Sequence, residues 1–277
     1  MNLFSQKTIK EILKNHNISP SKGLGQNFLI DKQTAQRITK TASIKPHETI
    51  LEIGPGIGNL TQELANRAKK VIAVEKDPKM IKVMEKTLKD IKNIEIVQKD
   101  ILRFLSDNKI QNNYNVVSNI PYYLTAPVIK RLLESKSPPK NIVLLVQKEM
   151  AERICEKPPK MNVLAVSVQF YAEAEIILHV SKNHFWPKPK VDSAVIEIIP
   201  KTSEIKVNKE LFFKIVKAGF SQPRKQLLNN LSKELKSDKN RIKLWLLKNE
   251  IRPSQRAETL GIDDWIKLTN SCELSTC

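Results

Sequence analysis

The stretch Leu51-Glu-Ile-Gly54-Pro-Gly56-Ile-Gly58-Asn-Leu-Thr61 decides how this chain folds. It holds three of only seven glycines in 277 residues, where average usage would supply roughly nineteen. An apolar run over 49–53 precedes it, and residues 60–68 follow with helical spacing. Glycine accepts positive φ and lets a ligand approach the backbone closely. The sequence therefore predicts a strand, a tight turn and a helix, with a nucleotide-type ligand at the turn.

The spacing of these glycines excludes the two commonest nucleotide loops. A dinucleotide fingerprint needs Gly-x-Gly-x-x-Gly, but Asn59 stands where the third glycine belongs. No Lys-Ser/Thr pair follows, as a Walker A loop requires. The acidic Glu75 ends the next apolar run, 71–74, where a carboxylate can hold two ribose hydroxyls. We interpret Gly54, Gly56 and Glu75 as a site for a nucleoside-bearing cofactor, with an ordinary turn beside a surface glutamate as the alternative.

The charge of the chain favours a polyanionic partner. Forty-seven Lys and Arg residues stand against 29 Asp and Glu residues, a net charge of +18, which exceeds what solubility requires. The alternative is a lysine-rich chain whose charged faces are simply solvated. Aromatic residues make up only 5% of the chain, so stacking on many successive bases is not the expected mode of binding.

Several other classes of protein are not supported. No apolar run approaches the length of about eighteen residues that a membrane span needs, and the N-terminus lacks a signal-peptide core. Cys155, Cys272 and Cys277 follow neither a disulfide framework nor a zinc spacing, and the four histidines form no ligand set. We expect a cytoplasmic protein without metal or membrane association.

Predicted strands and helices alternate from residue 49, which indicates a parallel sheet covered on both faces. Strands are expected over 49–53, 71–75, 94–98, 114–118 and 142–146. Helices are expected over 4–16, 31–44, 60–68, 78–90, 125–134 and 148–156. The runs 167–178 and 193–199 predict two further strands that pair antiparallel at the sheet edge. Residues 209–270 predict short helices. We expect one domain over 1–203, including a helical extension over 1–45, and a helical domain over 204–277.

Two motifs with chemical potential follow predicted strands. Asp100 can accept a hydrogen bond from an exocyclic amine, and Ile101 offers an apolar face to an adenine ring; a simple turn is the alternative. In Ser118-Asn119-Ile120-Pro121-Tyr122, the proline has a carbonyl but no N–H, so the loop presents acceptors beside a flat ring. Two acceptors on an exocyclic amine localise its lone pair and direct it at an electrophile. The alternative is an Asn-Pro loop with a core tyrosine.

In these motifs the chain resembles the ribosomal RNA adenine N6,N6-dimethyltransferases of the small-subunit type, which use S-adenosylmethionine, and the resemblance runs nearly end to end. It implies a Rossmann-like class I methyltransferase fold: a mostly parallel seven-stranded sheet with an antiparallel edge strand, followed by a small all-helical domain that binds RNA. Leu24-Gly-Gln-Asn27-Phe-Leu29 resembles the family's N-terminal motif, which implies that Asn27 and Leu29 touch the cofactor.

The resemblance also implies roles for the other motifs. The cofactor would be bound by Gly54, Gly56, Glu75, Asp100, Ile101 and Asn119. The target base would be positioned by Asn119, Pro121, Tyr122 and Phe185, since Phe185-Trp-Pro-Lys-Pro resembles the loop whose phenylalanine sandwiches the base opposite the tyrosine. Phe220-Ser-Gln-Pro-Arg224-Lys225 and Arg256-Ala-Glu258 resemble stretches of the C-terminal domain.

The implied activity is dimethylation of two adjacent adenines in a hairpin loop near the 3′ end of 16S rRNA. The partner would be small-subunit rRNA within a pre-30S particle, and the enzyme a monomer. Two alternatives remain open: a large-subunit rRNA methyltransferase of the macrolide-resistance type, and a non-catalytic rRNA-binding assembly factor.

Overall fold

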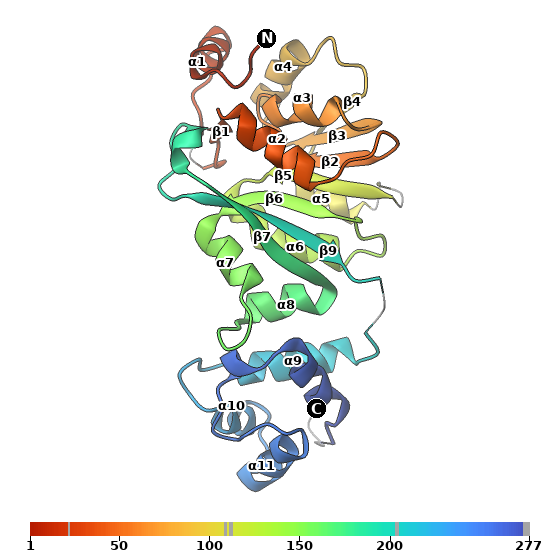
Figure 1. Ribbon diagram of the computed structural model, residues 1–277, viewed down its shortest axis with the longest axis vertical. Coiled ribbons are helices and arrows are strands. Elements are labelled where there is room, and N and C mark those ends of the chain that lie inside the picture. The colour runs from red at the N-terminus through yellow and green to blue at the C-terminus, as the bar shows by residue number, and fades with distance from the viewer. Residues whose placement is uncertain (22, 108–109, 111–112, 203–204, 274–277) are drawn as a thin grey trace. The chain divides into compact units, whose positions relative to one another are not determined.

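The computed structural model describes residues 1–21, 23–107, 110, 113–202 and 205–273 (Figure 1). The chain divides into two compact units: Met1–Ala151 with Glu173–Pro200, and Glu152–Ala172 with Lys201–Cys277. The boundary expected between residues 203 and 204 lies outside the described residues. The division also differs from the expected one, because residues 152–172 cluster with the C-terminal unit.

A seven-stranded sheet forms the centre of the first unit, in the order β4-β3-β2-β5-β6-β9-β7. Its strands are β2 (Thr49–Ile53), β3 (Lys70–Glu75), β4 (Ile94–Gln98), β5 (Tyr114–Asn119), β6 (Ile142–Gln147), β7 (Ala172–Val180) and β9 (Ser193–Pro200). The strands from β4 to β6 pair in parallel, and β9 pairs antiparallel with β6. The predicted, mostly parallel sheet is confirmed, with β9 second from the edge because β7 lies beyond it.

The strand order reverses between β2 and β5, and open α/β sheets bind ligands outside the carboxyl ends of the strands at such a reversal. Ile50 and Leu51 are adjacent residues of β2, and both are fully buried. Neighbouring side chains of a strand point to opposite faces, so this strand is covered on both sides. The reversal therefore puts the glycine-rich turn after β2 beside the Asn119 loop after β5.

Six helices of the first unit begin within two residues of the predicted positions, whereas the short helix α5 (Ile101–Ser106) was not predicted. The predicted ones are α1 (Gln6–Asn15), α2 (Lys32–Thr41), α3 (Asn59–Ala65), α4 (Pro78–Thr87), α6 (Thr125–Leu133) and the start of α7 (Lys148–Cys155). Ser5, Asp31 and Asp77 cap α1, α2 and α4 by accepting backbone N–H groups, which satisfies donors that the first turn leaves free. Ile38 of α2 and Leu64 of α3 pack with the sheet in one apolar cluster.

One predicted strand is wrong at its start. Residues 167–171 belong to the helix α8 (Val163–Tyr171), and the strand β7 begins only at Ala172. Short apolar runs do not distinguish a strand from a buried helix by periodicity alone. Val166 and Phe170 are one helical turn apart and pack against Phe212 in the core of the second unit. This contact also explains why 152–172 cluster with the C-terminal residues.

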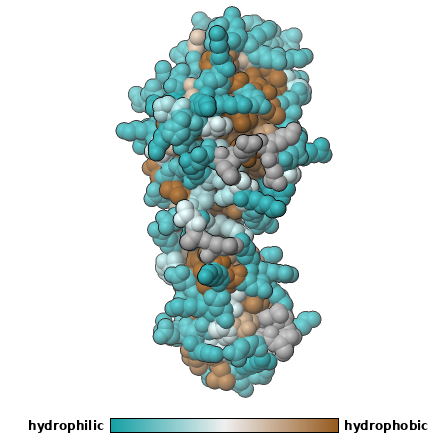
Figure 2. Space-filling model, turned by 90° about the vertical axis from the view of Figure 1, so that its right-hand side faces the viewer, coloured by the Kyte–Doolittle hydropathy of each residue, from teal (hydrophilic) through white to brown (hydrophobic). Residues whose placement is uncertain are grey.

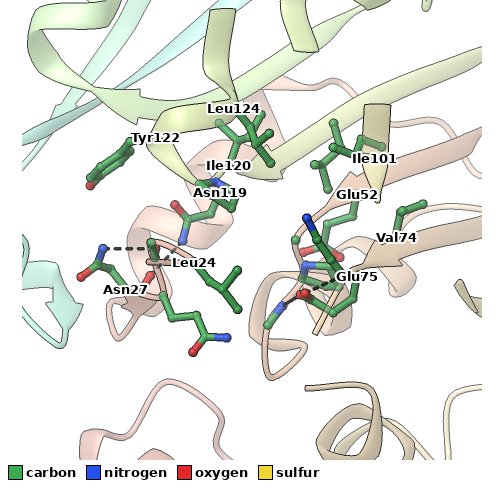
Figure 3. Close-up of a pocket in the computed structure, with 18 of the residues that line it drawn as sticks. Leu24, Asn27, Glu52, Val74, Glu75, Ile101, Asn119, Ile120, Tyr122 and Leu124 are labelled. Atoms are coloured by element: carbon green, nitrogen blue, oxygen red, sulfur yellow. Dashed lines mark hydrogen bonds between the residues drawn. The ribbon is translucent and has the colours of Figure 1, made fainter. Parts of the chain in front are cut away.

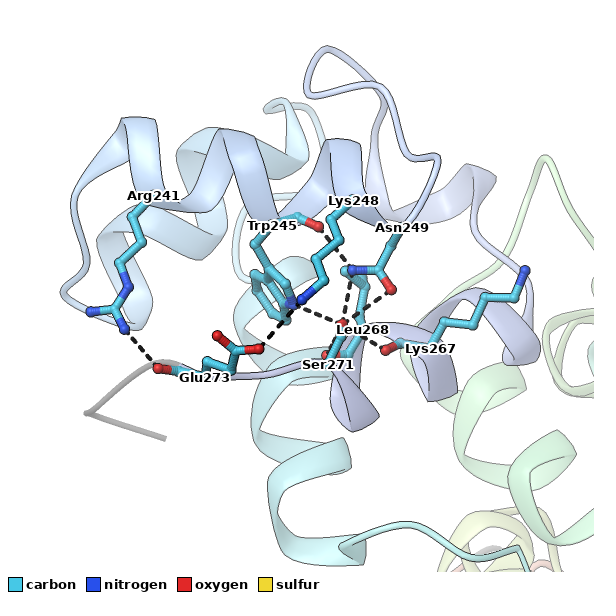
Figure 4. A network of polar contacts seen from close by, with 8 residues as sticks. All are labelled: Arg241, Trp245, Lys248, Asn249, Lys267, Leu268, Ser271 and Glu273. Atoms are coloured by element: carbon cyan, nitrogen blue, oxygen red, sulfur yellow. Dashed lines mark hydrogen bonds and ion pairs between the residues drawn. The ribbon is translucent and has the colours of Figure 1, made fainter.

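The second unit is helical, as predicted. It contains α8, α9 (Lys209–Gly219), α10 (Leu227–Glu234), α11 (Lys239–Lys248) and α12 (Ile262–Asn270). After α12, the Ser271 hydroxyl accepts the Trp245 indole N–H at 3.1 Å, and Glu273 binds Lys248 at 3.3 Å and Arg241 through its carbonyl (Figure 4). These contacts fasten the end of the described chain to α11 and engage two of its basic side chains.

Hydrophilic residues cover most of the face shown in Figure 2, with apolar groups between them. Among the described residues, no helix combines the length and apolar character of a membrane span.

Candidate functional site

A pocket opens at the carboxyl ends of β2, β3 and β5 (Figure 3). It lies at the strand-order reversal, where open α/β sheets bind their ligands. Its walls come from residues 24–28, 52–56, 59–60, 74–76, 99–101 and 119–124. The structure thus brings together most motifs that the sequence analysis singled out, from segments up to a hundred residues apart.

The glycine-rich turn has the geometry that its sequence predicts. Gly54 and Gly56 have φ of +63° and +61°, a region that glycine enters without strain. A Cβ on Gly54 would lie 3.1 Å from the Pro121 side chain, and one on Gly56 would lie 3.1 Å from the Phe28 ring. The turn is therefore packed directly against both the Asn119 loop and the N-terminal motif.

Glu75 ends β3 and contacts the glycine-rich turn through its side-chain carboxylate. Its carboxylate accepts the backbone N–H groups of Lys76, Asp77 and Gly56 at 2.8, 2.9 and 3.2 Å. Burial raises the pKa of Glu75, and these backbone hydrogen bonds offset part of the rise. Each carboxylate oxygen has more than one lone pair, so the group can also accept ribose hydroxyls while it holds Gly56 in place.

Glu52 is a pocket residue to which sequence reasoning assigned no role. It is 1% exposed, and its Oε2 atom has no hydrogen-bond partner among the described residues. Burial raises the pKa of Glu52 to about 8, and the negative charge of Glu75 adds to the effect. The available signal was an acidic residue at the end of an otherwise apolar strand. A buried carboxyl with an unpaired oxygen is an attractive partner for a cationic group.

Asp100 and Ile101 lie where the sequence places them, at the start of α5. Ile101 lines the pocket and is almost fully buried. The Asp100 Oδ1 atom accepts the N–H groups of Leu102 and Arg103, while Oδ2 lies 3.2 Å from the Lys76 ammonium. Burial pushes the pKa of Asp100 up, but the Lys76 and backbone hydrogen bonds outweigh it and lower the pKa overall. An adenine amine would share Oδ2 with Lys76, whose side chain is largely exposed.

Asn119 ends β5 with its amide orientation set by the N-terminal motif. Its Nδ2 donates to the Asn27 carbonyl at 3.2 Å, and the Asn27 side chain donates to the Gly25 carbonyl at 3.2 Å (Figure 3). The Asn119 Oδ1 atom accepts no hydrogen bond from the described protein atoms. The side chain therefore keeps an oxygen acceptor for the pocket, as the sequence analysis expected.

The Pro121 carbonyl, which was expected to accept a hydrogen bond from the substrate, already accepts one within the protein. It accepts the Leu124 N–H at 2.9 Å within the 3₁₀ turn η1 (Tyr122–Leu124). The Ile120 carbonyl, one residue earlier, accepts no hydrogen bond from the described protein atoms. Of the two carbonyls, that of Ile120 is thus the freer acceptor, while the Pro121 ring lies against Gly54. The motif over 118–122 could not reveal this hydrogen bond, because its donor, Leu124, lies beyond the motif in the η1 turn.

Tyr122 lines the pocket, and a hydrogen bond to its hydroxyl fixes the position of its ring. Its hydroxyl shares a 2.9 Å hydrogen bond with the buried Ser193 hydroxyl at the start of β9. Burial raises the pKa of Tyr122, and the Ser193 hydrogen bond offsets part of this rise. Ser193 carries a positioning contact that the motif alone did not identify. The next residue, Tyr123, also lines the pocket and is 54% exposed.

Leu29 and Phe185 do not take the positions that their motifs predicted. They pair directly across an antiparallel ribbon of β1 (Phe28–Leu29) and β8 (Phe185–Trp186), and they are 1% and 3% exposed. Both pack into an apolar cluster behind the pocket and neither lines it. Phe185 therefore has no free face for stacking on a base here. Because neighbouring strand residues face opposite ways, Phe28 lines the pocket instead.

The described residues contain no group of His, Cys, Asp and Glu side chains that could hold a metal ion. Cys155 and Cys272 form no disulfide bond with each other, and Cys277 lies outside the described residues.

A nucleoside-type pocket at the switch point of this sheet, with an amide acceptor and a tyrosine at its rim, defines a Rossmann-like methyltransferase. Residues 15–273 match the family model described as ribosomal RNA adenine dimethylase. The chain belongs to this family, and it is an S-adenosylmethionine-dependent ribosomal RNA adenine dimethylase. The fold, family and enzyme class expected from the sequence are confirmed.

Individual relatives agree with this assignment. Ribosomal RNA small subunit methyltransferase A of Bacillus pumilus is 41% identical over 274 residues, covering 94% of each chain. The protein of the same description from Dehalococcoides mccartyi is 40% identical, covering 94% of this chain and 90% of that one. The 23S rRNA methyltransferase ErmE superposes with a TM-score of 0.73 at 28% identity, over 88% of this chain and 99% of that one. A dimethyladenosine transferase from Plasmodium falciparum has a TM-score of 0.73 at 27% identity, with 86% and 94% coverage.

Proposed function

We propose that this protein dimethylates N6 of two adjacent adenines in a hairpin loop near the 3′ end of 16S rRNA. The observation that carries the proposal is the fixed amide of Asn119, which leaves an oxygen acceptor at the pocket beside Tyr122. The relatives at about 40% identity are described as small-subunit enzymes, which favours that substrate over large-subunit rRNA.

The pocket residues fit S-adenosylmethionine. Glu75 would accept the ribose hydroxyls, and Ile101 would cover the adenine ring beside Asp100. The unpaired oxygen of Glu52 suits a cofactor that carries cationic groups. When bound, the cofactor supplies a methyl group attached to a positively charged sulfur.

The loop after β5 would then prepare the target nitrogen. Asn119 Oδ1 and the Ile120 carbonyl accept the two amine hydrogens, while Tyr122 stacks on the base. These contacts pull the amine out of conjugation and localise its lone pair. The nitrogen becomes acidic once it is methylated, so the loop needs no strong base. An adenine in a hairpin loop costs less to splay out than one in a duplex.

We also propose that the C-terminal unit binds RNA through two adjoining loops. The Leu227 N–H donates to the Gln255 carbonyl at 2.7 Å, which brings the loop after α9 beside the loop before α12. Arg224 and Lys225 on the first loop and Arg252 on the second are exposed, and none forms an ion pair with the described residues. Their charges are therefore available to phosphates, unlike those of Arg241 and Lys248, which bind Glu273.

The proposed setting is the cytoplasm, where the enzyme would act as a monomer on a pre-30S particle.

Two alternatives make different predictions. The fold match to ErmE keeps large-subunit rRNA as a possible substrate, and a non-catalytic assembly factor would bind rRNA without modifying it. Tritiated methyl transfer to unmethylated small subunits, compared with large subunits and followed by nucleoside analysis, separates all three. We expect N6,N6-dimethyladenosine in the small-subunit RNA alone; label in the large subunit or in neither particle would refute the proposal.

The Asn119→Ala variant tests the chemistry of the site. We expect turnover to fall by about 10² or more, on the scale of losing one positioned polar group, with cofactor and particle affinity retained. Asn183→Ala is the matched control, because Asn183 is exposed and lies outside the pocket. Equal turnover in a folded Asn119→Ala protein would reduce Asn119 to a turn residue.

A further inference from the structure

Tyr123 is an exposed aromatic residue at the rim of the pocket, and the chemistry described above does not use it. Its relative exposure is 54%, and it lines the pocket together with Tyr122. Among the large hydrophobic side chains that are exposed in the described chain, it alone is aromatic. An exposed ring at the mouth of a pocket is a surface on which a planar group can stack.

The two tyrosines cannot serve the same base. They are consecutive residues of the 3₁₀ turn η1, in which three residues complete a turn, so their side chains project in directions roughly 120° apart. The Tyr122 hydroxyl binds the buried Ser193, and this contact keeps its ring at the pocket wall. Tyr123 accordingly points elsewhere, toward solvent at the rim.

The turn that carries Tyr123 is held firmly. The Pro121 carbonyl accepts the Leu124 N–H at 2.9 Å, and the Thr125 hydroxyl donates to the Tyr122 carbonyl at 3.0 Å. Thr125 itself is 1% exposed. A ring on such a turn is presented in a fixed direction, which lowers the entropic cost of using it as a binding surface.

A polynucleotide substrate offers a matching partner. When one base is drawn into a pocket, the base beside it loses a stacking neighbour, and an aromatic side chain can replace that neighbour. We propose that Tyr123 stacks on the base of a nucleotide adjacent to the target adenine and forms a second nucleotide subsite. This inference rests on the proposed RNA-methylating function and adds a contact outside the reacting atoms.

The test compares Tyr123→Ala and Tyr123→Phe with the wild-type enzyme on unmethylated small subunits. Stacking is worth about 1–3 kcal/mol per base, so we expect kcat/KM of Tyr123→Ala to fall roughly 5- to 150-fold. Tyr123→Phe should retain most activity, because the ring and not the hydroxyl makes the contact. The cofactor Kd should be unchanged in both variants. Ile199→Ala is the control, since Ile199 is 48% exposed and does not line the pocket.

Small subunits rebuilt with an abasic nucleotide on one or the other side of the target adenine supply the decisive comparison. On the particle that lacks the stacked base, wild-type activity should drop to the level of Tyr123→Ala, and the variant should lose nothing further. The proposal is overturned if Tyr123→Ala matches wild type on intact particles, or if its loss persists on both abasic particles. A wild-type enzyme that methylates no small subunit would instead refute the proposed function, so the two failures are distinct.

Discussion

Replacing Glu52 with glutamine should change how cofactor binding depends on pH. The carboxyl is 1% exposed, Oε2 is unpaired, and the pKa is about 8 in the empty protein. About nine in ten molecules therefore carry the proton on Glu52 at pH 7. A cationic cofactor favours the ionised carboxyl, so its binding should release close to one proton at pH 7. Affinity should rise about tenfold between pH 7 and pH 9 as this proton is lost beforehand.

Titration calorimetry in buffers of different ionisation enthalpy measures both quantities. The Glu52→Gln variant keeps the shape of the side chain but cannot ionise, so it should release no proton and show a flat affinity over this range. Glu48→Gln is the matched control, because Glu48 is also buried but does not line the pocket. A tenfold pH dependence that survives in Glu52→Gln would refute the assignment of the proton to Glu52.

The same substitution has a signature in stability. The folded-state pKa of Glu52 lies above the ordinary value of 4.5, so its contribution to stability is complete below pH 4.5 and is lost as pH rises through about 8. At about 1.36 kcal/mol per pH unit, the loss that accumulates between pH 4.5 and about 8 is on the order of 5 kcal/mol. Between pH 5 and 9, the melting temperature of the empty wild-type protein should therefore fall further than that of Glu52→Gln. Parallel curves for the two proteins would contradict this account.

Two further predictions concern positioning and RNA binding. Ser193→Ala should lower turnover about two- to tenfold, the value of one hydrogen bond, with cofactor affinity unchanged; Tyr122→Phe should lose as much, and the double variant no more. An additive double variant would show that the two hydroxyls act separately. Neutralising Arg224 and Lys225 should reduce the logarithmic salt slope of rRNA binding by roughly one per lost phosphate contact, and an unchanged slope would assign both charges to solvent.

Much of the architecture could be read from the chain because its signals are local. The glycines after β2 need positive φ wherever the turn lies in space, and the alternation of apolar runs with helical stretches already implies a parallel sheet. Acidic Glu75 and the Asn119 loop both end strands, and parallel strands end at one edge of a sheet. Their location at the same edge of the sheet therefore followed from the sequence, while the order of the strands brought them to one pocket.

Other features depended on partners distant in the chain. Val163–Tyr171 became a helix because Val166 and Phe170 pack on Phe212 in the second unit. Phe185 turned into the core because it pairs with Leu29, far away in sequence. In both cases a local apolar pattern was compatible with two arrangements, and packing selected one of them.

The functional groups of the site show the same division. The residue types at Asn119 and Tyr122 determine that an acceptor and a ring are available. Which atoms remain free is decided by the fold: the Asn27 carbonyl occupies the Asn119 amide nitrogen, and the η1 turn occupies the Pro121 carbonyl. Burial raises the pKa of Glu52, and its Oε2 atom stays unpaired. Hydrogen-bond occupancy and desolvation depend on neighbours in space, so only the tertiary structure could determine them.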